Sequence, residues 1–235
     1  MVAFVIVADL RTGSTLLASS LDRHPDVRCY GELFHSEDLP DNRVEGVGRD
    51  SASAEALLRA LFRGTGERAC GFKMMTFLPL ASEARWPDAW ERLRAVPGLR
   101  VLWLTRRDRL AQYASLEVAR RTGVYHPHDD DRLYRPEHRP TIAVDPAAFL
   151  AWVAERDALL ERRRRELEGL PALELAYEDL AERWDTTLAR VQAFLEVPGV
   201  PVEPAKRKQE GRSLAEVIRN YGELARSPTI MRYAG

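Results

Sequence analysis

The sequence predicts an α/β fold in which helices cover both faces of a mostly parallel central sheet, giving three α/β/α layers. Two observations predict this fold. Short apolar runs alternate with longer segments of helical spacing along the chain. In addition, the first run, Val2–Ala8, is continuously apolar and rich in β-branched residues, which is typical of a strand buried on both faces of a sheet.

The other elements follow from the spacing of their apolar residues. The remaining strands are expected at Val27–Tyr30, Gly71–Met75, Arg100–Thr105 and Ala172–Ala176. Helices are expected at Ser14–Leu21, Ala54–Phe62, near Glu83–Ala95, at Leu110–Arg120, from Asp145-Pro146 onward, and after Ala176 through Leu195. The capping-box pattern Ser213–Glu216 opens what we expect to be the last helix.

The length of 235 residues predicts a single domain, 1–235, with a tail from about residue 200. Periodicity disappears over residues 121–144, and a connection of that length is typical of a functional loop or lid.

Composition excludes several classes of protein. The formal net charge of −1 argues against a dedicated nucleic-acid-binding domain, which usually has a basic excess. Two cysteines, Cys29 and Cys70, cannot form a disulfide framework, so we expect reduced thiols. No segment approaches the roughly 18–20 apolar residues of a membrane span, and the first apolar run is too short for a signal peptide. We therefore expect a cytoplasmic protein without a membrane partner.

The turn after the first strand, Arg11–Thr15 (RTGST), predicts a phosphate-binding loop and thus a P-loop-like version of the fold. It departs from the triphosphate pattern G-x-x-x-x-G-K-[ST], because Ala8 replaces the first glycine and Ser14 replaces the lysine. Backbone N–H groups at Gly13–Leu16 can still bind a phosphate at the helix N-terminus, and Arg11 can supply the cation. The alternative is that RTGST only begins an ordinary helix, capped by Thr12.

The residues after the strand Arg100–Thr105 indicate what kind of donor the loop binds. A triphosphatase needs an acidic residue near the end of a neighbouring strand to hold magnesium, whereas this strand is followed by Arg106, Arg107 and Asp108, with no obvious metal carboxylate. A site built on arginines suits a transferable group of low charge, such as a sulfuryl group, and we expect no metal. Ser115 lies eight residues after Arg107 and can complete a second anion site. A solvated helix start with an unrelated serine is the alternative.

Because Arg11 and Arg107 both follow strands of a parallel sheet, we expect them to face the same crevice beyond the carboxyl ends of the strands.

Together these features resemble the sulfotransferases that use 3′-phosphoadenosine 5′-phosphosulfate (PAPS), in particular the bacterial carbohydrate branch with the trehalose and nodulation-factor sulfotransferases. The resemblance spans Phe4 to about Leu195. It is found in the segments FVIVADLRTGSTLL, HPDVRCYGELF, GFKMM, RRDRLAQYASLEVARRTGVYH and LAYEDL. It implies an enzyme that transfers a sulfuryl group from PAPS to a hydroxyl of a sugar or glycosylated metabolite and releases 3′,5′-ADP.

The resemblance also implies roles for individual residues. The loop residues bind the 5′-phosphosulfate, and an arginine and a serine spaced like Arg107 and Ser115 bind the 3′-phosphate, over which the basic C-terminal segment closes. The implied donor-binding residues are Arg11, Thr12, Gly13, Ser14, Thr15, Leu16, Arg107, Ser115, Arg207, Lys208 and Arg212. A solvated basic run is the alternative for the last three.

Glu32 lies at the position of the catalytic glutamate in related bacterial enzymes, so the resemblance implies that it is the general base. The alternatives are that Glu32 caps a turn or pairs with an arginine. Lys73, at the end of a predicted strand, can add a cation or orient the acceptor, or be an ordinary exposed lysine.

The region 121–144 is expected to bind the acceptor together with Ser36–Asp50, with Tyr125 and His126 as contacts, and His126 is the alternative to Glu32 as the base. Its histidines and aspartates fit no defined zinc or calcium spacing. The run Glu161–Glu166 (ERRRRE) is interpreted as the solvent face of a helix. Two other functions remain open, a small-molecule kinase or NTPase with a degenerate loop, and a nucleotide-binding protein without transfer activity.

Overall fold

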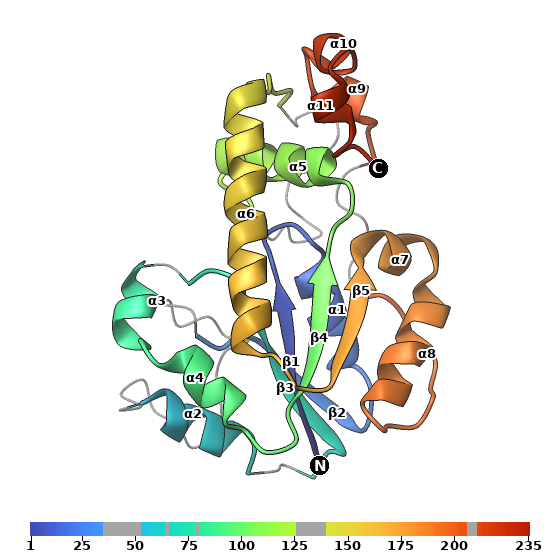
Figure 1. The fold of residues 1–235 in the computed structure, drawn as a ribbon. Coiled ribbons are helices and arrows are strands. Elements are labelled where there is room, and N and C mark those ends of the chain that lie inside the picture. The colour runs from blue at the N-terminus through green and yellow to red at the C-terminus, as the bar shows by residue number, and fades with distance from the viewer. Residues whose placement is uncertain (35–52, 64–65, 79, 126–139, 206–210) are drawn as a thin grey trace. The chain divides into compact units, whose positions relative to one another are not determined.

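A computed structural model describes residues 1–34, 53–63, 66–78, 80–125, 140–205 and 211–235. Within these residues, five strands form one sheet in the order β2-β3-β1-β4-β5 (Figure 1). All neighbouring strands are parallel, which confirms the predicted sheet. The strands are β1 (Val2–Ala8), β2 (Val27–Glu32), β3 (Ala69–Met75), β4 (Arg100–Thr105) and β5 (Ala172–Ala176).

The helices agree with most of the expected segments. They are α1 (Ser14–Leu21), α2 (Ala54–Leu61), α3 (Leu80–Arg85), α4 (Ala89–Arg94), α5 (Arg109–Thr122), α6 (Pro146–Glu166), α7 (Tyr177–Glu182), α8 (Trp184–Phe194), α9 (Leu214–Val217), α10 (Tyr221–Leu224) and α11 (Pro228–Met231).

Three helix predictions were wrong in extent. The segment Glu83–Ala95 is broken between α3 and α4 at Pro87, because proline lacks an N–H group and disfavours helical backbone in the residue before it. The helix after β5 is broken at Arg183, whose φ of −134° and ψ of 48° are not helical. The capping box of Ser213 and Glu216 does open α9, but α10 and α11 follow, so α9 is not the last helix.

The chain divides into two compact units, each described separately here. The first comprises residues 1–105 and 159–206 and contains the whole sheet. The second comprises residues 106–158 and 207–235 and contains α5, α9, α10 and α11, while residues of α6 fall in both. The prediction of a single domain over 1–235 stays a prediction.

Helices cover both faces of the sheet in the first unit, which confirms the three-layer arrangement. Successive residues of a strand point to opposite faces. Accordingly, Val5 and Val7 of β1 belong to a buried cluster that includes side chains of α2 and α4. Phe4 and Ile6 belong to a second cluster with side chains of α1, α7 and α8.

Both cysteine thiols are free and buried in the sheet, as expected for reduced thiols. Burial raises the pKa of the Cys70 thiol to about 12 and raises that of Cys29 as well. Both groups are therefore protonated, weakly nucleophilic thiols at neutral pH.

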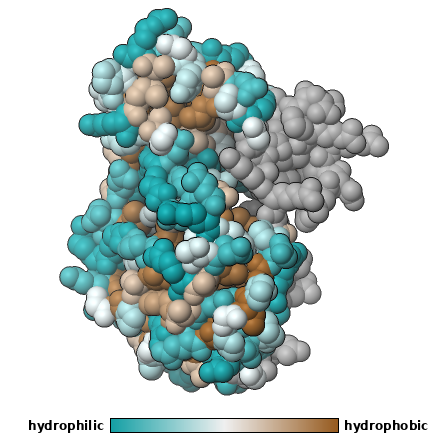
Figure 2. Space-filling view, turned by 90° about the vertical axis from the view of Figure 1, so that its right-hand side faces the viewer, coloured by the Kyte–Doolittle hydropathy of each residue, from teal (hydrophilic) through white to brown (hydrophobic). Residues whose placement is uncertain are grey.

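The surface carries few large apolar side chains. Met1 and Tyr125 are the exposed large hydrophobic residues of the described part of the chain. On the face shown in Figure 2, small groups of hydrophobic residues are interspersed with hydrophilic ones. No helix of the described residues is long and apolar enough to cross a membrane.

The ERRRRE run is not simply a solvent face. Arg162 is exposed as predicted, but Arg163 is only 3% exposed. The Arg163 Nε donates to the Thr76 carbonyl at 2.8 Å, its Nη1 lies 2.6 Å from Glu166 Oε2, and its guanidinium lies 4.2 Å from the centre of the Trp90 ring. Because the Thr76 N–H donates to the Ala8 carbonyl at 2.8 Å, Arg163 helps to fix the ends of β3 and β1.

Replacing Arg163 with methionine should lower the free energy of unfolding by about 2 kcal/mol or more, since it removes hydrogen bonds of a buried charged group. Urea unfolding of Arg163→Met and Arg162→Met measures this. Arg162 is the matched control because it pairs with the same carboxyl group from an exposed position. Equal losses in the two variants would contradict the interpretation.

Candidate active site

The turn between β1 and α1 has a defined shape that its own residues maintain. The Leu10 N–H donates to Asp9 Oδ1 at 2.8 Å, and the Thr12 hydroxyl donates to the Asp9 carbonyl at 2.8 Å. Arg11 has a φ of 60° and Gly13 a φ of 83°. Left-handed backbone is uncommon for a residue other than glycine, so the conformation of Arg11 is one that the surrounding turn must enforce.

Gly13 is required at the start of α1 for two reasons. Its φ is left-handed, and a Cβ atom there would lie 2.8 Å from the Tyr177 ring. Gly13 is also the N-cap, and no side chain caps the helix. The alternative that Thr12 caps an ordinary helix is therefore wrong. The first-turn N–H groups, from Ser14 to Leu16, are left for an anionic ligand.

A lysine, a glutamate and a threonine meet next to this turn. The Lys73 ammonium lies 2.9 Å from Glu32 Oε1 and donates to Thr15 Oγ1 at 2.9 Å. Glu32 and Lys73 are paired in the register of β2 and β3, and Thr15 belongs to the first turn of α1. The structure thus brings together three of the predicted site residues from three separate elements.

Two details differ from the sequence-based expectations. Lys73 lies inside β3, not at its end, and is only 4% exposed, so the interpretation as an ordinary exposed lysine is wrong. Glu32 is part of β2 and pairs with Lys73. The register of β2 shifts between Tyr30 and Glu32, and an irregularity of this kind re-aims a side chain.

The chemistry of the cluster follows from these contacts. The Glu32 carboxyl group lies against the Lys73 ammonium, and a carboxylate is a group that can accept a proton. Because the Thr15 hydroxyl accepts from Lys73, its own hydrogen is directed elsewhere and can be donated to a ligand oxygen. The cluster therefore offers a carboxylate, a cation and a hydroxyl donor beside the turn between β1 and α1.

The second predicted anion site lies in the second unit. Arg107 is exposed and directly precedes Asp108, the N-cap of α5, whose side chain accepts from the Ala111 N–H at 2.7 Å. Ser115 is half-buried within α5. The Asp108 side chain and the Tyr233 carbonyl accept the first N–H groups of this helix. A phosphate at this place would therefore depend on side chains.

The alternative of a solvated helix start stays open for this second site. Arg11 and Arg107 belong to different units, so a crevice shared by the two arginines stays a prediction.

Some of the other predicted site residues lie within the part of the chain that the structure describes, and some do not. Ser36–Asp50, His126, Arg207 and Lys208 lie outside the described residues. Tyr125 is exposed after the end of α5, and Arg212 is half-buried. Of the expected acceptor region 121–144, the first two residues belong to α5, and Ile142 forms a parallel bridge with Ile218. No group of three or more potential metal ligands occurs among the described residues.

Sequence reasoning did not identify two residues that shape the phosphate loop. Asp9 holds the turn through its side chain and its carbonyl, and its position directly after a buried strand was the available indication. Tyr177 packs against Gly13, but it is far away in the sequence, and its position becomes clear only when the chain is folded.

Known proteins are similar to this chain in sequence and in fold. It is 30% identical over 232 residues to nodulation protein H of Rhizobium tropici, covering 95% of this chain and 88% of the relative. It is 28% identical to nodulation protein H of Rhizobium meliloti, covering 94% and 89%. A crystal structure of a sulfotransferase from Alicyclobacillus acidocaldarius superposes with a TM-score of 0.54 at 20% identity, over 99% of this chain and 94% of that chain.

The sulfotransferase family profile matches residues 3–201, which include the phosphate loop, Glu32, Lys73 and the segment from Arg107 to Ser115. The structural likeness supports the same conclusion for the fold, and the predicted resemblance is thereby confirmed. The chain belongs to the sulfotransferase family.

Proposed function

We propose that this chain is an enzyme that transfers the sulfuryl group of PAPS to a hydroxyl group of a sugar or glycosylated metabolite and releases 3′,5′-ADP. The observation that carries the proposal is the Lys73 ammonium bonded to both Glu32 and Thr15 beside the phosphate loop. Membership in the sulfotransferase family supports the reaction class.

The loop is suited to the 5′ end of the donor. The uncapped N–H groups at Gly13 to Leu16 and the hydroxyl of Thr15 can bind the phosphosulfate oxygens. The Thr12 hydroxyl donates to the Asp9 carbonyl, so Thr12 contributes to donor binding through its backbone. Arg11 stabilises the charge that develops on the leaving phosphate.

The 3′-phosphate is assigned to Arg107 and Ser115, together with Arg207 and Lys208. This phosphate is the group that separates PAPS from ATP, and a planar guanidinium matches its oxygens.

Transfer then needs an in-line attack by the acceptor oxygen on sulfur. The bond between this oxygen and sulfur forms, and the bond between sulfur and the 5′-phosphate oxygen breaks. Glu32 takes the proton of the acceptor hydroxyl. Lys73 uses two of its three N–H groups on Glu32 and Thr15, and the third can stabilise an oxygen of the transferred group.

The acceptor is a small molecule held by residues 121–144, with Tyr125 and His126 as contacts. The exposed position of Tyr125 supports a role in binding. The resemblance to carbohydrate sulfotransferases supports a sugar hydroxyl as the acceptor. We place the reaction in the cytoplasm, with neither a nucleic acid nor a membrane as partner and with no metal ion.

The protein should bind 3′,5′-ADP without magnesium, and Arg107→Ala should weaken this binding about 10- to 100-fold, because hydrogen bonds to charged groups contribute about 1.5–3 kcal/mol each. Isothermal titration calorimetry measures both affinities. Arg120→Ala is the matched control, since Arg120 is an exposed arginine within α5, the helix that follows Arg107. Binding of ATP–Mg²⁺ in preference to 3′,5′-ADP would instead support the kinase or NTPase alternative.

Glu32→Gln should lower kcat about 100-fold or more, because general base catalysis contributes roughly 10²–10⁴-fold, while 3′,5′-ADP affinity stays close to that of the wild type. Turnover is followed by mass spectrometry of products from PAPS with a panel of sugars and glycosylated metabolites. Glu55→Gln, at an exposed helix position, is the control. Full turnover in Glu32→Gln would exclude Glu32 as the base, and binding without turnover in the wild type would favour a nucleotide-binding protein.

A further inference from the structure

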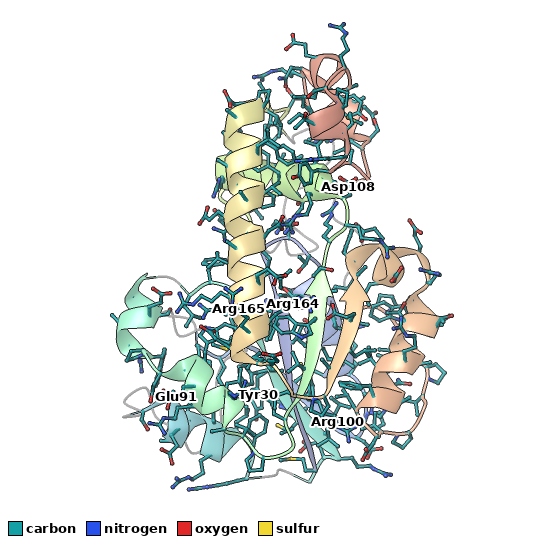
Figure 3. All side chains as sticks on the ribbon, in the orientation of Figure 1. Tyr30, Glu91, Arg100, Asp108, Arg164 and Arg165 are labelled. Carbon is teal, nitrogen blue, oxygen red and sulfur yellow. The ribbon has the colours of Figure 1, made fainter. Side chains whose placement is uncertain are left out.

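The segment after α11 contacts the first turn of α5, directly next to Arg107. The Tyr233 carbonyl accepts from the Arg109 N–H at 2.9 Å and from the Leu110 N–H at 3.2 Å. A Cβ atom at Gly235 would lie 3.1 Å from Asp108 Cβ, so the chain after Tyr233 continues along the same turn. Figure 3 shows Asp108 where this turn begins. The N-terminus of α5 is thus closed by backbone from a distant part of the sequence.

The ring of Tyr233 holds this carbonyl in place. It packs edge-on against Phe149 of α6, with ring centres 5.9 Å apart and an interplanar angle of 83°. Phe149 in turn contacts Tyr113 of α5 at 5.4 Å and Trp152 at 6.5 Å. Four aromatic rings, from α5, α6 and the segment after α11, therefore form one cluster within the second unit.

A second set of contacts fixes the first residue of α5 from the side. The Arg109 guanidinium lies 2.8 Å from Asp157 Oδ1, donates to Gln112 Oε1 at 3.0 Å, and lies 5.4 Å from the centre of the Trp152 ring. The peptide of Arg109 and its side chain are thus both anchored, while the side chain of Arg107, two residues earlier, is exposed.

We propose that Tyr233 is a positioning residue that sets Arg107 relative to Ser115 and thereby determines how strongly the enzyme prefers a 3′-phosphorylated nucleotide. This inference rests on the proposed function. Helix ends fray unless their first N–H groups have partners. Fraying of this turn would move Arg107 while Ser115, in the middle of α5, stays in place. A preorganised pair avoids the entropic cost of ordering Arg107 when the phosphate binds.

Because the Tyr233 carbonyl accepts the Arg109 and Leu110 N–H groups, the start of α5 must bind an anion in a different way from the start of α1. At α1 the first N–H groups have no side-chain cap and can bind a phosphate directly. At α5 these groups are bonded to Tyr233 and Asp108, so the 3′-phosphate must be bound by side chains. The contribution of Tyr233 should therefore appear in the affinity for the 3′-phosphate and not in the affinity for the 5′-phosphate.

Calorimetric titration of wild type and Tyr233→Ala with 3′,5′-ADP and with 5′-AMP tests the proposal. We define the preference ratio as the dissociation constant of 5′-AMP divided by that of 3′,5′-ADP. We expect this ratio to fall by about tenfold in Tyr233→Ala, the effect of losing one good cap, because 3′,5′-ADP binds more weakly and 5′-AMP affinity is unchanged. Tyr233→Phe keeps the ring contact and should restore the wild-type ratio. Tyr221→Ala removes a tyrosine from α10 and is the matched control.

The outcomes separate the two proposals. A wild type that binds 5′-AMP as tightly as 3′,5′-ADP overturns the proposed function and this inference with it. A clear wild-type preference that Tyr233→Ala retains overturns this inference alone. A parallel loss of both affinities would show a general structural role and overturns it as well.

If Tyr233→Ala does not fold, Arg109→Pro and Arg109→Ala are compared in the same titrations. Proline is tolerated at the first position of a helix, and only this variant removes the Arg109 N–H, the closer of the two that bind the Tyr233 carbonyl. A lower ratio in the proline variant than in the alanine variant supports the proposal, and equal ratios contradict it.

Discussion

The ammonium group of Lys73 is buried inside a parallel sheet, and this placement constrains everything around it. An unpaired charge in such a position costs several kcal/mol, so neighbouring elements must supply partners. The adjacent strand provides Glu32, and the first turn of α1 provides Thr15. The packing of α1 on the sheet and the pairing of β2 with β3 are therefore coupled to a site with an acid–base group, a cation and a hydroxyl.

The ends of the strands beside this cluster are held by backbone contacts. Thr76 donates to the Ala8 carbonyl and accepts from the buried Arg163, which fixes the point where β1 becomes the phosphate loop. The loop itself contains two left-handed residues and is closed by Asp9. A turn with this many internal contacts presents its N–H groups without reorganising when an anion binds, and such preorganisation strengthens electrostatic stabilisation of a transition state.

In the second unit, the start of α5 differs from the start of α1 in the partners of its first N–H groups. In our proposal the 3′-phosphate is bound there by side chains, those of Arg107 before α5 and Ser115 within it, because the first N–H groups of that helix are bonded to Asp108 and Tyr233. Aromatic packing between Tyr113, Phe149 and Tyr233 maintains the arrangement. The first N–H groups of α1 have no side-chain cap, whereas those of α5 are bonded within the protein, so the two helix starts differ in how they can bind an anion.

The sequence by itself determined β1, α1, β4 and β5 to the residue, because an unbroken apolar run or a regular helical spacing is a local property of the chain. It also put forward site candidates, the loop residues and Glu32 through motif order and family resemblance, and Lys73 through its place in a predicted strand. Only the tertiary structure decided that Lys73 and Arg163 are buried, since burial of one charged residue depends on which distant side chains pack around it. The same holds for the Tyr233 carbonyl at α5, because a backbone hydrogen bond between distant segments leaves no pattern in the amino-acid sequence.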